Sequence, residues 1–305
     1  MCKISCTINS FSDFIQVIKI LKSEDKMLFY RGHSNKEWQL TPSIYRDNHI
    51  EKEDTYFREA IRRLPEEFPS SMSAFDKLVK MQHYELPTRL LDVTSNSLVG
   101  LFFACQEAYK EVDQETGQKE IEKLDGKLYV FSVPKDKIKY FDSNRACIIS
   151  NLAKLSLKRI DDKDINYLIY KIRDERPYYT KKVFIEEALF EVRCVLPKLN
   201  NKRIKRQDGA FLLYGMEKMD KRKPAVLPPY ITLYEFIVKE NAKKEILDIL
   251  NLMGINNASL FPETEKVMKQ IIAETVVAKD TAQNGMSKNA RDGSPQKSGT
   301  VSETK

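Results

Sequence analysis

The stretch QHYELPTRLLDVT, residues 82–94, leads directly into SNSLVGLFFAC, residues 95–105, and the two together decide the fold. Arg89 and Asp92 stand among leucines, where an unpaired charge is costly. Both therefore need partners, and Arg31, at the end of the apolar run MLFYRG, is the natural partner of Asp92. The simplest interpretation is a buried ion-pair and hydrogen-bond network that fixes a strand against a helix.

Outward from this stretch, apolar residues at helical spacing predict helices. They are expected at residues 11–21, 53–64, 73–83, 97–109 and 240–252, with further helices in 142–182 and a final one from 263 to about 274. β-Branched and aromatic runs predict strands at 27–32, 126–133, 209–215 and 231–238. Residues 110–124 are expected to be a charged linker, and 184–195 fit helix or strand equally well.

These elements predict an α+β fold, with a single compact domain built from a mixed or antiparallel sheet flanked by helices. The domain is expected to span residues 10–275. Residues 276–305 contain no aromatic side chain and few large aliphatic ones, so they cannot bury enough apolar area to offset their ordering entropy. A disordered C-terminal tail is predicted there.

Composition favours an ordinary globular protein, with 42% hydrophobic and 31% charged residues. No run approaches the ~20 apolar residues of a membrane helix, and the first residues lack the apolar core of a signal peptide. We expect a soluble, cytoplasmic protein without membrane contact. The net charge of +7 is modest, and its basic residues cluster at 198–206 (KLNNKRIKR). That loop is either a solvated surface or a contact for a protein or nucleic-acid target.

Three segments supply the candidate site: FYRGH, the stretch 82–94, and RIKRQDGAF at 203–211. Polar side chains near an apolar floor are typical of a binding pocket. The candidate residues are Arg31, His33, His83, Tyr84, Arg89, Asp92, Thr94 and Gln207. No metal is expected, because His33 and His83 would need a third ligand such as Asp92. Phosphate-loop and dinucleotide-binding glycine patterns are absent from the sequence.

The order of FYRGH, LTPSIYR, PTRLLDVT with its apolar helix, RQDGAF and GINNASLFPE resembles the FRG domain family, named for its Phe/Tyr-Arg-Gly motif. The resemblance runs from about residue 10 to about residue 275. Two positions depart from the family pattern: Val93 stands where an aromatic residue is usual, and Ser97 where proline is usual. Both departures alter packing at the helix start and leave the polar residues in place. The family resemblance implies no defined activity.

A more remote similarity is to ADP-ribosyltransferases, which hold NAD with an arginine on an early strand. They use a serine or threonine at a strand end, and a late glutamate or glutamine. Arg31, Thr94 and Gln207 match these positions, so the similarity implies a catalytic set with NAD as co-substrate. Arg31 would clamp phosphates and Thr94 would orient the ribose. Gln207 carries no charge and cannot act as a general base, although Asp208 or Asp92 could substitute.

Two other functions fit the same residues. The domain could be a non-catalytic recognition or interaction module, or it could hydrolyse a nucleotide or nucleic acid. If the pocket processes NAD, Arg31, Thr94 and Gln207 must converge on one concave surface. His83, Tyr84 and Arg89 would then line or support it.

Overall fold

The computed structural model describes residues 6–113, 119–156, 162–179, 182–220 and 222–261. The chain divides into two units, Met1–Asn256 and Asn257–Lys305. The second unit is described only for helix α10 (Asn257–Leu260) and Phe261. The predicted helix at 263–274 and the predicted disordered tail at 276–305 lie outside the described residues.

Within the described residues, eight strands form one mixed sheet in the order β1-β10-β6-β2-β3-β9-β8-β7. The pairs β1–β10 and β7–β8 are parallel and the other pairs are antiparallel. The predicted α+β class and mixed sheet are thereby confirmed. The strands are β1 (Cys6–Ile8), β2 (Lys26–His33), β3 (Leu90–Thr94), β6 (Gly126–Pro134), β7 (Lys139–Tyr140), β8 (Val192–Leu196), β9 (Gly209–Tyr214) and β10 (Thr232–Val238).

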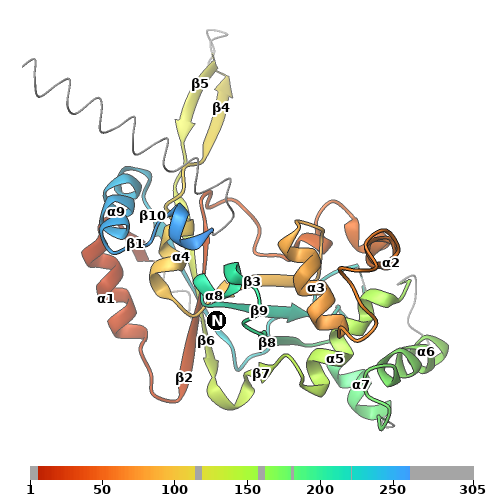
Figure 1. The fold of residues 1–305 in the computed structure, drawn as a ribbon. Coiled ribbons are helices and arrows are strands. Elements are labelled where there is room, and N and C mark those ends of the chain that lie inside the picture. Colours follow the sequence, from red (N-terminus) through yellow and green to blue (C-terminus); the bar gives the residue numbers. More distant parts are fainter. Residues whose placement is uncertain (1–5, 114–118, 157–161, 180–181, 221, 262–305) are drawn as a thin grey trace, which may run out of the picture. The chain divides into compact units, whose positions relative to one another are not determined.

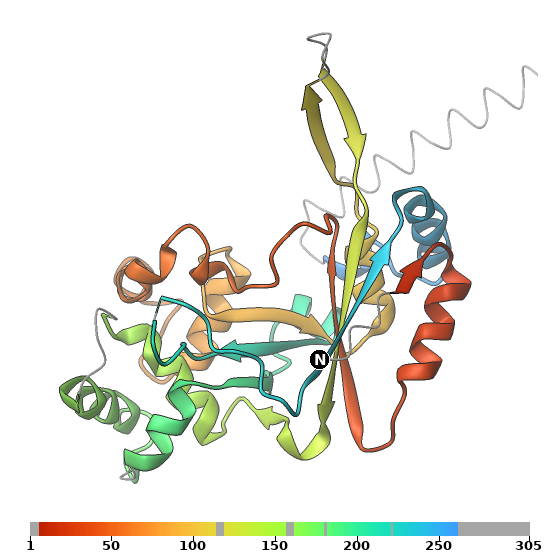
Figure 2. The ribbon, with the colours of Figure 1, turned by 180° about the vertical axis from the view of Figure 1, so that it is seen from behind.

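The sheet is split between β2 and β3, which pair only where Tyr30 meets Thr94. On one side β2 pairs with β6 over its whole length, and on the other side β3 pairs with β9 over five residues. β3 and β9 run at a steep angle to β2 and β6 (Figures 1 and 2). Because the two half-sheets diverge from one bridge, the polar groups of Arg31 and its neighbours are not covered by a continuous strand ladder.

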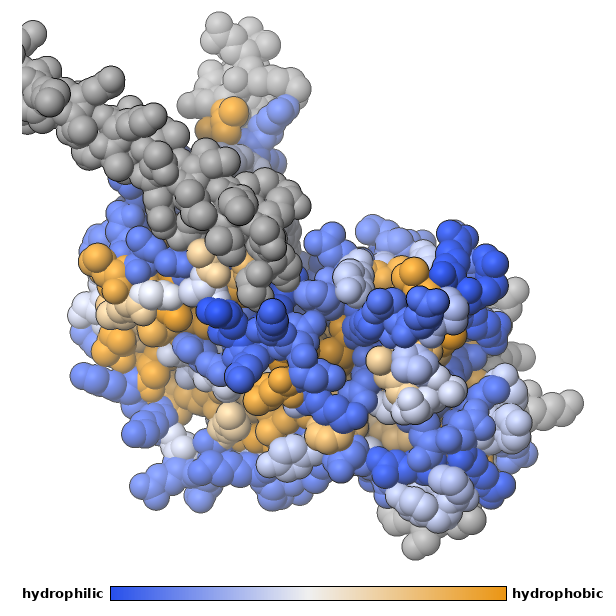
Figure 3. Space-filling model, viewed as in Figure 1, coloured by the Kyte–Doolittle hydropathy of each residue, from blue (hydrophilic) through white to orange (hydrophobic). Residues whose placement is uncertain are grey.

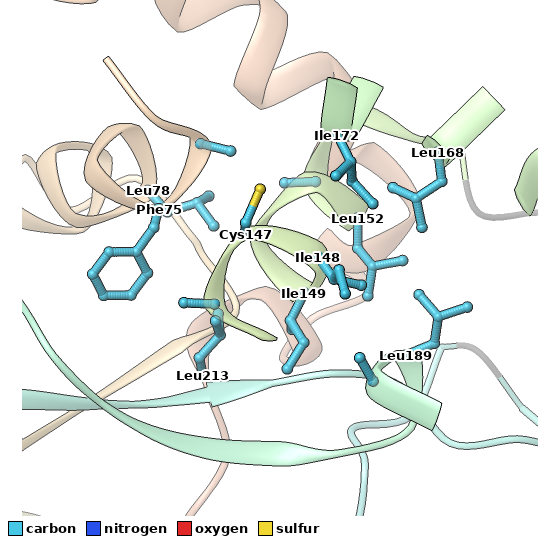
Figure 4. Packing of buried hydrophobic residues seen from close by; sticks show 14 of the residues in the cluster. Phe75, Leu78, Cys147, Ile148, Ile149, Leu152, Leu168, Ile172, Leu189 and Leu213 are labelled. Atoms are coloured by element: carbon cyan, nitrogen blue, oxygen red, sulfur yellow. The ribbon is translucent and has the colours of Figure 1, made fainter. Parts of the chain in front are cut away.

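Helices cover both half-sheets. They are α1 (Phe11–Leu21), α2 (Glu53–Arg63), α3 (Ala74–His83), α4 (Ser97–Ala104), α5 (Asn144–Asn151), α6 (Asp162–Arg173), α7 (Lys182–Leu189), α8 (Lys202–Arg206) and α9 (Glu240–Leu252). α2, α3, α5, α6 and α7 pack with one face of β3, β8 and β9 around a large apolar cluster. Figure 4 shows α5, with Cys147 and Ile148, between Phe75 and Leu78 of α3 on one side and Leu168 and Ile172 of α6 on the other.

The central helix α4 is shorter than predicted, because it ends at Ala104 rather than continuing to residue 109. The Gln106 carbonyl, just beyond its end, accepts a hydrogen bond of 3.1 Å from Nζ of the buried Lys243 on α9. This contact between distant segments fixes the helix end, and sequence spacing gave no sign of it.

The linker predicted at 110–124 is wrong. Instead, β4 (Tyr109–Asp113) and β5 (Lys119–Lys123) form a two-stranded antiparallel sheet. The hairpin projects away from the rest of the first unit (Figures 1 and 2). Its strands place Lys110 opposite Glu122, and such cross-strand charge pairs support strands that carry little apolar content.

Gly32 of the FYRGH motif allows α4 to cross β2 closely. A Cβ atom at this position would lie far inside van der Waals distance of the Ala104 amide nitrogen and the Gly100 carbonyl oxygen. Both are backbone atoms of α4 or its end, so neither can swing aside as a side chain would. The glycine therefore sets the distance between the helix and the sheet, next to Arg31.

We expect Gly32→Ala to lower the free energy of unfolding by about 1–3 kcal/mol, the usual cost of overpacking a close contact. Chemical denaturation measures the change, and Gly254→Ala is the control for losing a glycine, since space is open around Gly254 and the cost there comes only from its positive φ. A Gly32→Ala variant as stable as the parent chain would contradict the close packing of α4 on β2.

Candidate functional site

A cavity of about 240 Å³ opens where the two half-sheets separate. Its walls come from β2, β3, the start of β9, α3, α4 and α8. The lining residues are Tyr30, Arg31, Gly32, Val79, Gln82, His83, Asp92, Val93, Thr94, Phe103, Arg203, Ile204, Gln207, Gly209, Ala210 and Phe211. Arg31, Thr94 and Gln207 thus line one concave surface, which is the arrangement that a site processing NAD needs.

Arg31 is held in place by two hydrogen bonds. Its Nη1 donates to the Asp92 carbonyl oxygen at 2.7 Å, and its Nε donates to Nε2 of His33 at 3.0 Å. Burial lowers the pKa of the guanidinium, and the Asp92 carboxylate opposes this shift. Arg31 is therefore a cation that lines the cavity and is held in place by His33 of β2 and Asp92 of β3.

The predicted buried pair between Arg31 and Asp92 is wrong in its burial. The two side chains do face each other, with Nη1 3.8 Å from Oδ2, but they are 21% and 56% exposed. Asp92 points from β3 toward the cavity, away from the buried side chains of Leu91 and Val93 on either side of it. An ion pair this exposed contributes little to stability, so the pair is available to a ligand.

His33 supports Arg31 from behind without lining the cavity. Its Nε2 accepts from Arg31, so its Nδ1, 3.3 Å from the Trp38 carbonyl oxygen, carries the proton and donates to that oxygen. Burial lowers the pKa of His33 to about 4, with a further lowering by the Arg31 charge. His33 is therefore neutral near neutral pH, which is the state that accepts the Arg31 hydrogen bond.

This pKa predicts acid sensitivity. The unfolded chain takes up the His33 proton at an ordinary pKa of 6.5 and the folded chain at about 4. The stability gained from keeping the ring neutral is therefore complete above the unfolded value and is lost as pH falls from 6.5 toward 4. Between about pH 7 and pH 4, we expect the parent chain to lose up to about 3 kcal/mol more than His33→Gln. Equal losses in urea titrations of the two proteins would contradict the assignment.

Asp92 is positioned by a relay of side chains. Nε2 of Gln82 donates to its Oδ2 at 2.7 Å, and the Thr88 hydroxyl donates to Oε1 of Gln82 at 2.6 Å. Thr88 in turn accepts from the Leu90 amide at 3.2 Å. Because the Thr88 donation fixes which end of the Gln82 amide faces Asp92, the carboxylate is oriented by α3 and β3 together.

Thr94 joins the end of β3 to the start of β9 and to α4. Its hydroxyl donates to the Gln207 carbonyl oxygen at 2.5 Å and accepts from the Asn96 amide at 3.0 Å. The Asn96 side chain then caps α4 by accepting from the Leu98 amide at 3.0 Å. The hydroxyl predicted to orient a ribose thus already holds the cavity wall together.

We therefore expect Thr94→Ala to cost about 1–3 kcal/mol of stability, because it leaves the Asn96 amide and the Gln207 carbonyl unpaired. Thr94→Ser keeps the hydroxyl and is the better probe of ligand binding, with an expected cost below about 1 kcal/mol. Denaturation of both variants measures the difference. The prediction fails if alanine proves as well tolerated as serine.

Arg89 does not line the cavity, so of the two expected roles, lining or supporting it, its position fits only support. Its guanidinium is fully buried, donates from Nε to Oε1 of Glu53 at 2.8 Å and from Nη1 to the Tyr214 carbonyl at 2.9 Å, and contacts Glu53 again through Nη2. Burial alone would lower the pKa of Arg89, but Glu53 and Tyr45 together outweigh burial and the pKa is raised. Arg89 supports the fold behind the site.

Tyr84 lies outside the cavity as well, with its side chain 65% exposed. It lines a second hollow of about 240 Å³, whose walls include Lys80, Lys198 and Asn201. His83 and Val79 line both hollows. His83 therefore lines the cavity that holds Arg31, whereas Tyr84 lines only the neighbouring hollow.

Several lining residues were not among the candidates from sequence. Gln82 stands beside His83 in the quoted motif, and its role depends on the relay from Thr88. Tyr30, Phe103 and Phe211 give the cavity aromatic walls, and Arg203 brings a second guanidinium from α8. Tyr30, Arg203 and Phe211 lie in the candidate segments 29–33 and 203–211, and Arg203 also belongs to the basic cluster at 198–206. Phe103 lies in the apolar helix, where nothing set it apart from its neighbours.

The cavity can bind a phosphorylated ligand that carries a flat ring. Arg31 and Arg203 offer guanidinium donors, which suit phosphate oxygens. Tyr30, Phe103 and Phe211 offer apolar faces. Among the described residues, no group of three or more histidine, cysteine, aspartate or glutamate side chains is placed to hold a metal ion. The helices of the described residues include none long and apolar enough to cross a membrane.

Comparison with known protein families matches residues 26–113 to the FRG domain. The matched segment runs from the start of β2 to the end of β4 and contains Arg31, Asp92 and Thr94. Gln207 lies outside it. Searches of curated proteins and of solved structures found no similar chain.

Proposed function

With an FRG domain match over residues 26–113 as the premise, we propose that the chain binds NAD in the cavity and transfers its ADP-ribosyl group to a protein or nucleic-acid acceptor. One observation carries the proposal. Arg31, Thr94 and Gln207 line a single cavity, although 113 residues separate the last two. They come from β2, the end of β3 and the residues just before β9, which are neighbours in the sheet.

The reaction asks little of the protein beyond positioning and charge. The bond between the nicotinamide nitrogen and ribose C1′ breaks, its electron pair leaves with nicotinamide, and C1′ becomes cation-like. An acceptor nucleophile then bonds to C1′ and gives up a proton. Asp92 is the single carboxylate among the described residues that line the cavity, so it would stabilise the cation-like centre and take the proton.

The other lining residues would hold the substrate. Arg31 would bind pyrophosphate oxygens through the guanidinium hydrogens that His33 and Asp92 do not engage, and Gln207 would orient a ribose hydroxyl. A cavity of about 240 Å³ is slightly smaller than most small-molecule pockets. It would therefore enclose one half of the dinucleotide and leave the other half at the opening.

Incubation with NAD labelled in its adenylate part tests the proposal. Release of nicotinamide together with transfer of label to a macromolecule is expected, and Asp92→Asn should lose both while remaining folded. Free ADP-ribose without transfer would indicate a hydrolase that uses water as the acceptor. If Asp92→Asn and the parent chain release nicotinamide equally, the role of Asp92 is wrong.

A recognition module that binds its ligand without catalysing a reaction is the second candidate. The chemistry of Gln207 and Thr94 favours it. Gln207 is uncharged, and the Thr94 hydroxyl is committed to the Gln207 carbonyl and the Asn96 amide. Calorimetry separates the two candidates. Saturable binding of NAD or ADP-ribose without nicotinamide release would support recognition and exclude transfer.

A further inference from the structure

The second hollow and the cavity at the split of the sheet are neighbours that share a wall. Val79 and His83 of α3 line both of them, and residues four apart on a helix lie one above the other on the same face. The segment 197–207 also reaches both, because it contributes Asn201 to the second hollow and Arg203 to the cavity. A ligand that extends out of the cavity along α3 therefore enters the second hollow.

Neither hollow alone has the usual volume of a small-molecule pocket. Each measures about 240 Å³, below the roughly 300–1,000 Å³ that is typical, and the two together reach that range. The half of a dinucleotide that the cavity leaves outside thus has a space of the same size next to it.

Both lysines that line the second hollow are paired with carboxylates. Nζ of Lys198 lies 2.8 Å from Oδ2 of Asp76, and Nζ of Lys80 contacts Oε2 of Glu67. The arginines lie in the cavity instead. The phosphates of a dinucleotide therefore belong in the cavity, and a ring without charge belongs in the second hollow.

The remaining lining of the second hollow suits a flat heterocycle. Met72, Val79 and Pro197 give it apolar contacts. The ring of Tyr84, with the residue 65% exposed, offers a face on which a base can stack. In Figure 3, which views the molecule as in Figure 1, apolar side chains show between hydrophilic ones over the region of α3 and α8.

Asn201 supplies hydrogen-bond donors to the same hollow. Its Oδ1 accepts from the amide of Arg203 at 2.7 Å and from that of Ile204 at 3.3 Å, and so caps α8. The cap leaves the two hydrogens of Nδ2 for a ligand, and Asn200 beside it adds a second side-chain amide. Side-chain amides pair well with the ring nitrogens and the exocyclic amine of adenine.

We propose that the second hollow binds the adenine ring of the NAD molecule whose nicotinamide end lies in the cavity. The ring stacks on Tyr84 and accepts a hydrogen bond from Nδ2 of Asn201, and the link between the two halves of NAD passes Val79 and His83. That the ring belongs to NAD rests on the proposed function, whereas adenine binding by the hollow does not.

Calorimetric titrations with NAD, nicotinamide mononucleotide and AMP test the adenine site, because the second ligand lacks adenine and the third lacks nicotinamide. Tyr84→Ala should weaken binding of NAD and AMP by about fivefold or more, the usual effect of losing a stacked ring, and leave binding of nicotinamide mononucleotide unchanged. Tyr84→Phe should bind all three ligands as the parent chain does. The matched control is Tyr170→Ala, which removes a ring from α6 at a residue that is 60% exposed and should change none of the three affinities.

Asn201→Asp tests the hydrogen bond without removing the cap of α8, since a carboxylate oxygen also accepts from the two amides. The change replaces the donors of Nδ2 with an acceptor. It should weaken binding of NAD by about threefold or more beyond any loss for nicotinamide mononucleotide, whose phosphate reports the effect of the added negative charge.

Three outcomes would overturn the adenine site: no binding of AMP by the parent chain, unchanged affinity for NAD and AMP in Tyr84→Ala, or equal losses for NAD and nicotinamide mononucleotide in that variant. The proposed function fails separately. A parent chain that binds NAD and AMP in this pattern but releases no nicotinamide would contradict the transfer and support the adenine site.

Discussion

Glu53→Ala is expected to lower the free energy of unfolding by about 3–5 kcal/mol, the usual cost of removing one partner of a buried ion pair. Glu53 is 3% exposed and Arg89 is not exposed at all. Without Glu53, the Arg89 guanidinium would keep only its bond to the Tyr214 carbonyl and a long contact of 3.4 Å to the Tyr45 hydroxyl. A buried charge without a counter-ion accounts for the size of the effect.

Two controls make this result interpretable. Glu59→Ala removes an exposed carboxylate from the same helix, where it pairs with Arg62 and Arg63, and should cost less than about 1 kcal/mol. Glu53→Leu/Arg89→Met removes both buried charges and should cost less than the sum of the two single changes. Strict additivity in denaturant titrations, or a cost for Glu53→Ala no greater than that for Glu59→Ala, would contradict the buried pair.

Arg31→Ala is expected to weaken NAD binding by about 30-fold or more, because losing a partly desolvated, charged contact costs about 2 kcal/mol or more. Arg31→Lys keeps the charge but not the planar pair of donors, so it should recover only part of the affinity. Calorimetric titration measures both variants.

The control for Arg31→Ala is Arg58→Ala, which removes an arginine whose side chain is 60% exposed on α2. Its affinity for NAD should equal that of the parent chain. Arg31→Ala also removes two internal hydrogen bonds, so the melting temperature of each variant is recorded to show that it is folded at the temperature of the titration. Unchanged affinity in folded Arg31→Ala would exclude Arg31 from the binding site.

Much of the fold could be predicted because local patterns and tertiary packing agree. The helix over residues 11–21 and the helix over 240–252 lie where apolar spacing indicated. The segment 184–195 was ambiguous for a physical reason. It contains both the end of α7 and strand β8, and these are separated by only two residues, Phe190 and Glu191.

The partner of Arg89 could not be predicted from sequence. The surroundings of Arg89 indicated that it needed a counter-ion, but Glu53 lies in a helix rich in charges, and nothing distinguishes it from Glu59 on the same helix. Tertiary packing buries the first turn of α2 and thereby selects Glu53. The sequence thus indicated that Arg89 and Asp92 both need partners, but it named a partner only for Asp92, whereas the buried pair is that of Arg89 with Glu53.

The convergence of the site was predictable in part. FYRGH and the stretch 82–94 are joined through the single bridge between Tyr30 and Thr94. Gln207 reaches the site because Asp208, with φ of 46°, turns the chain sharply from α8 into β9. The split of the sheet that opens the cavity depends on strand pairing over long separations, which periodicity does not report.

The central claim, that NAD occupies the cavity at the split of the sheet, is tested most directly by methyl NMR during a titration with NAD. Val79 of α3 and Ile204 of α8 supply methyl groups among the residues that line the cavity, whereas the methyl groups of Ile8, Ile246 and Leu250 are buried elsewhere in the first unit. We expect saturable shifts confined to the lining methyls and lost in Arg31→Ala. Absence of shifts at saturating NAD, or shifts centred on Ile8, Ile246 and Leu250, would contradict the account.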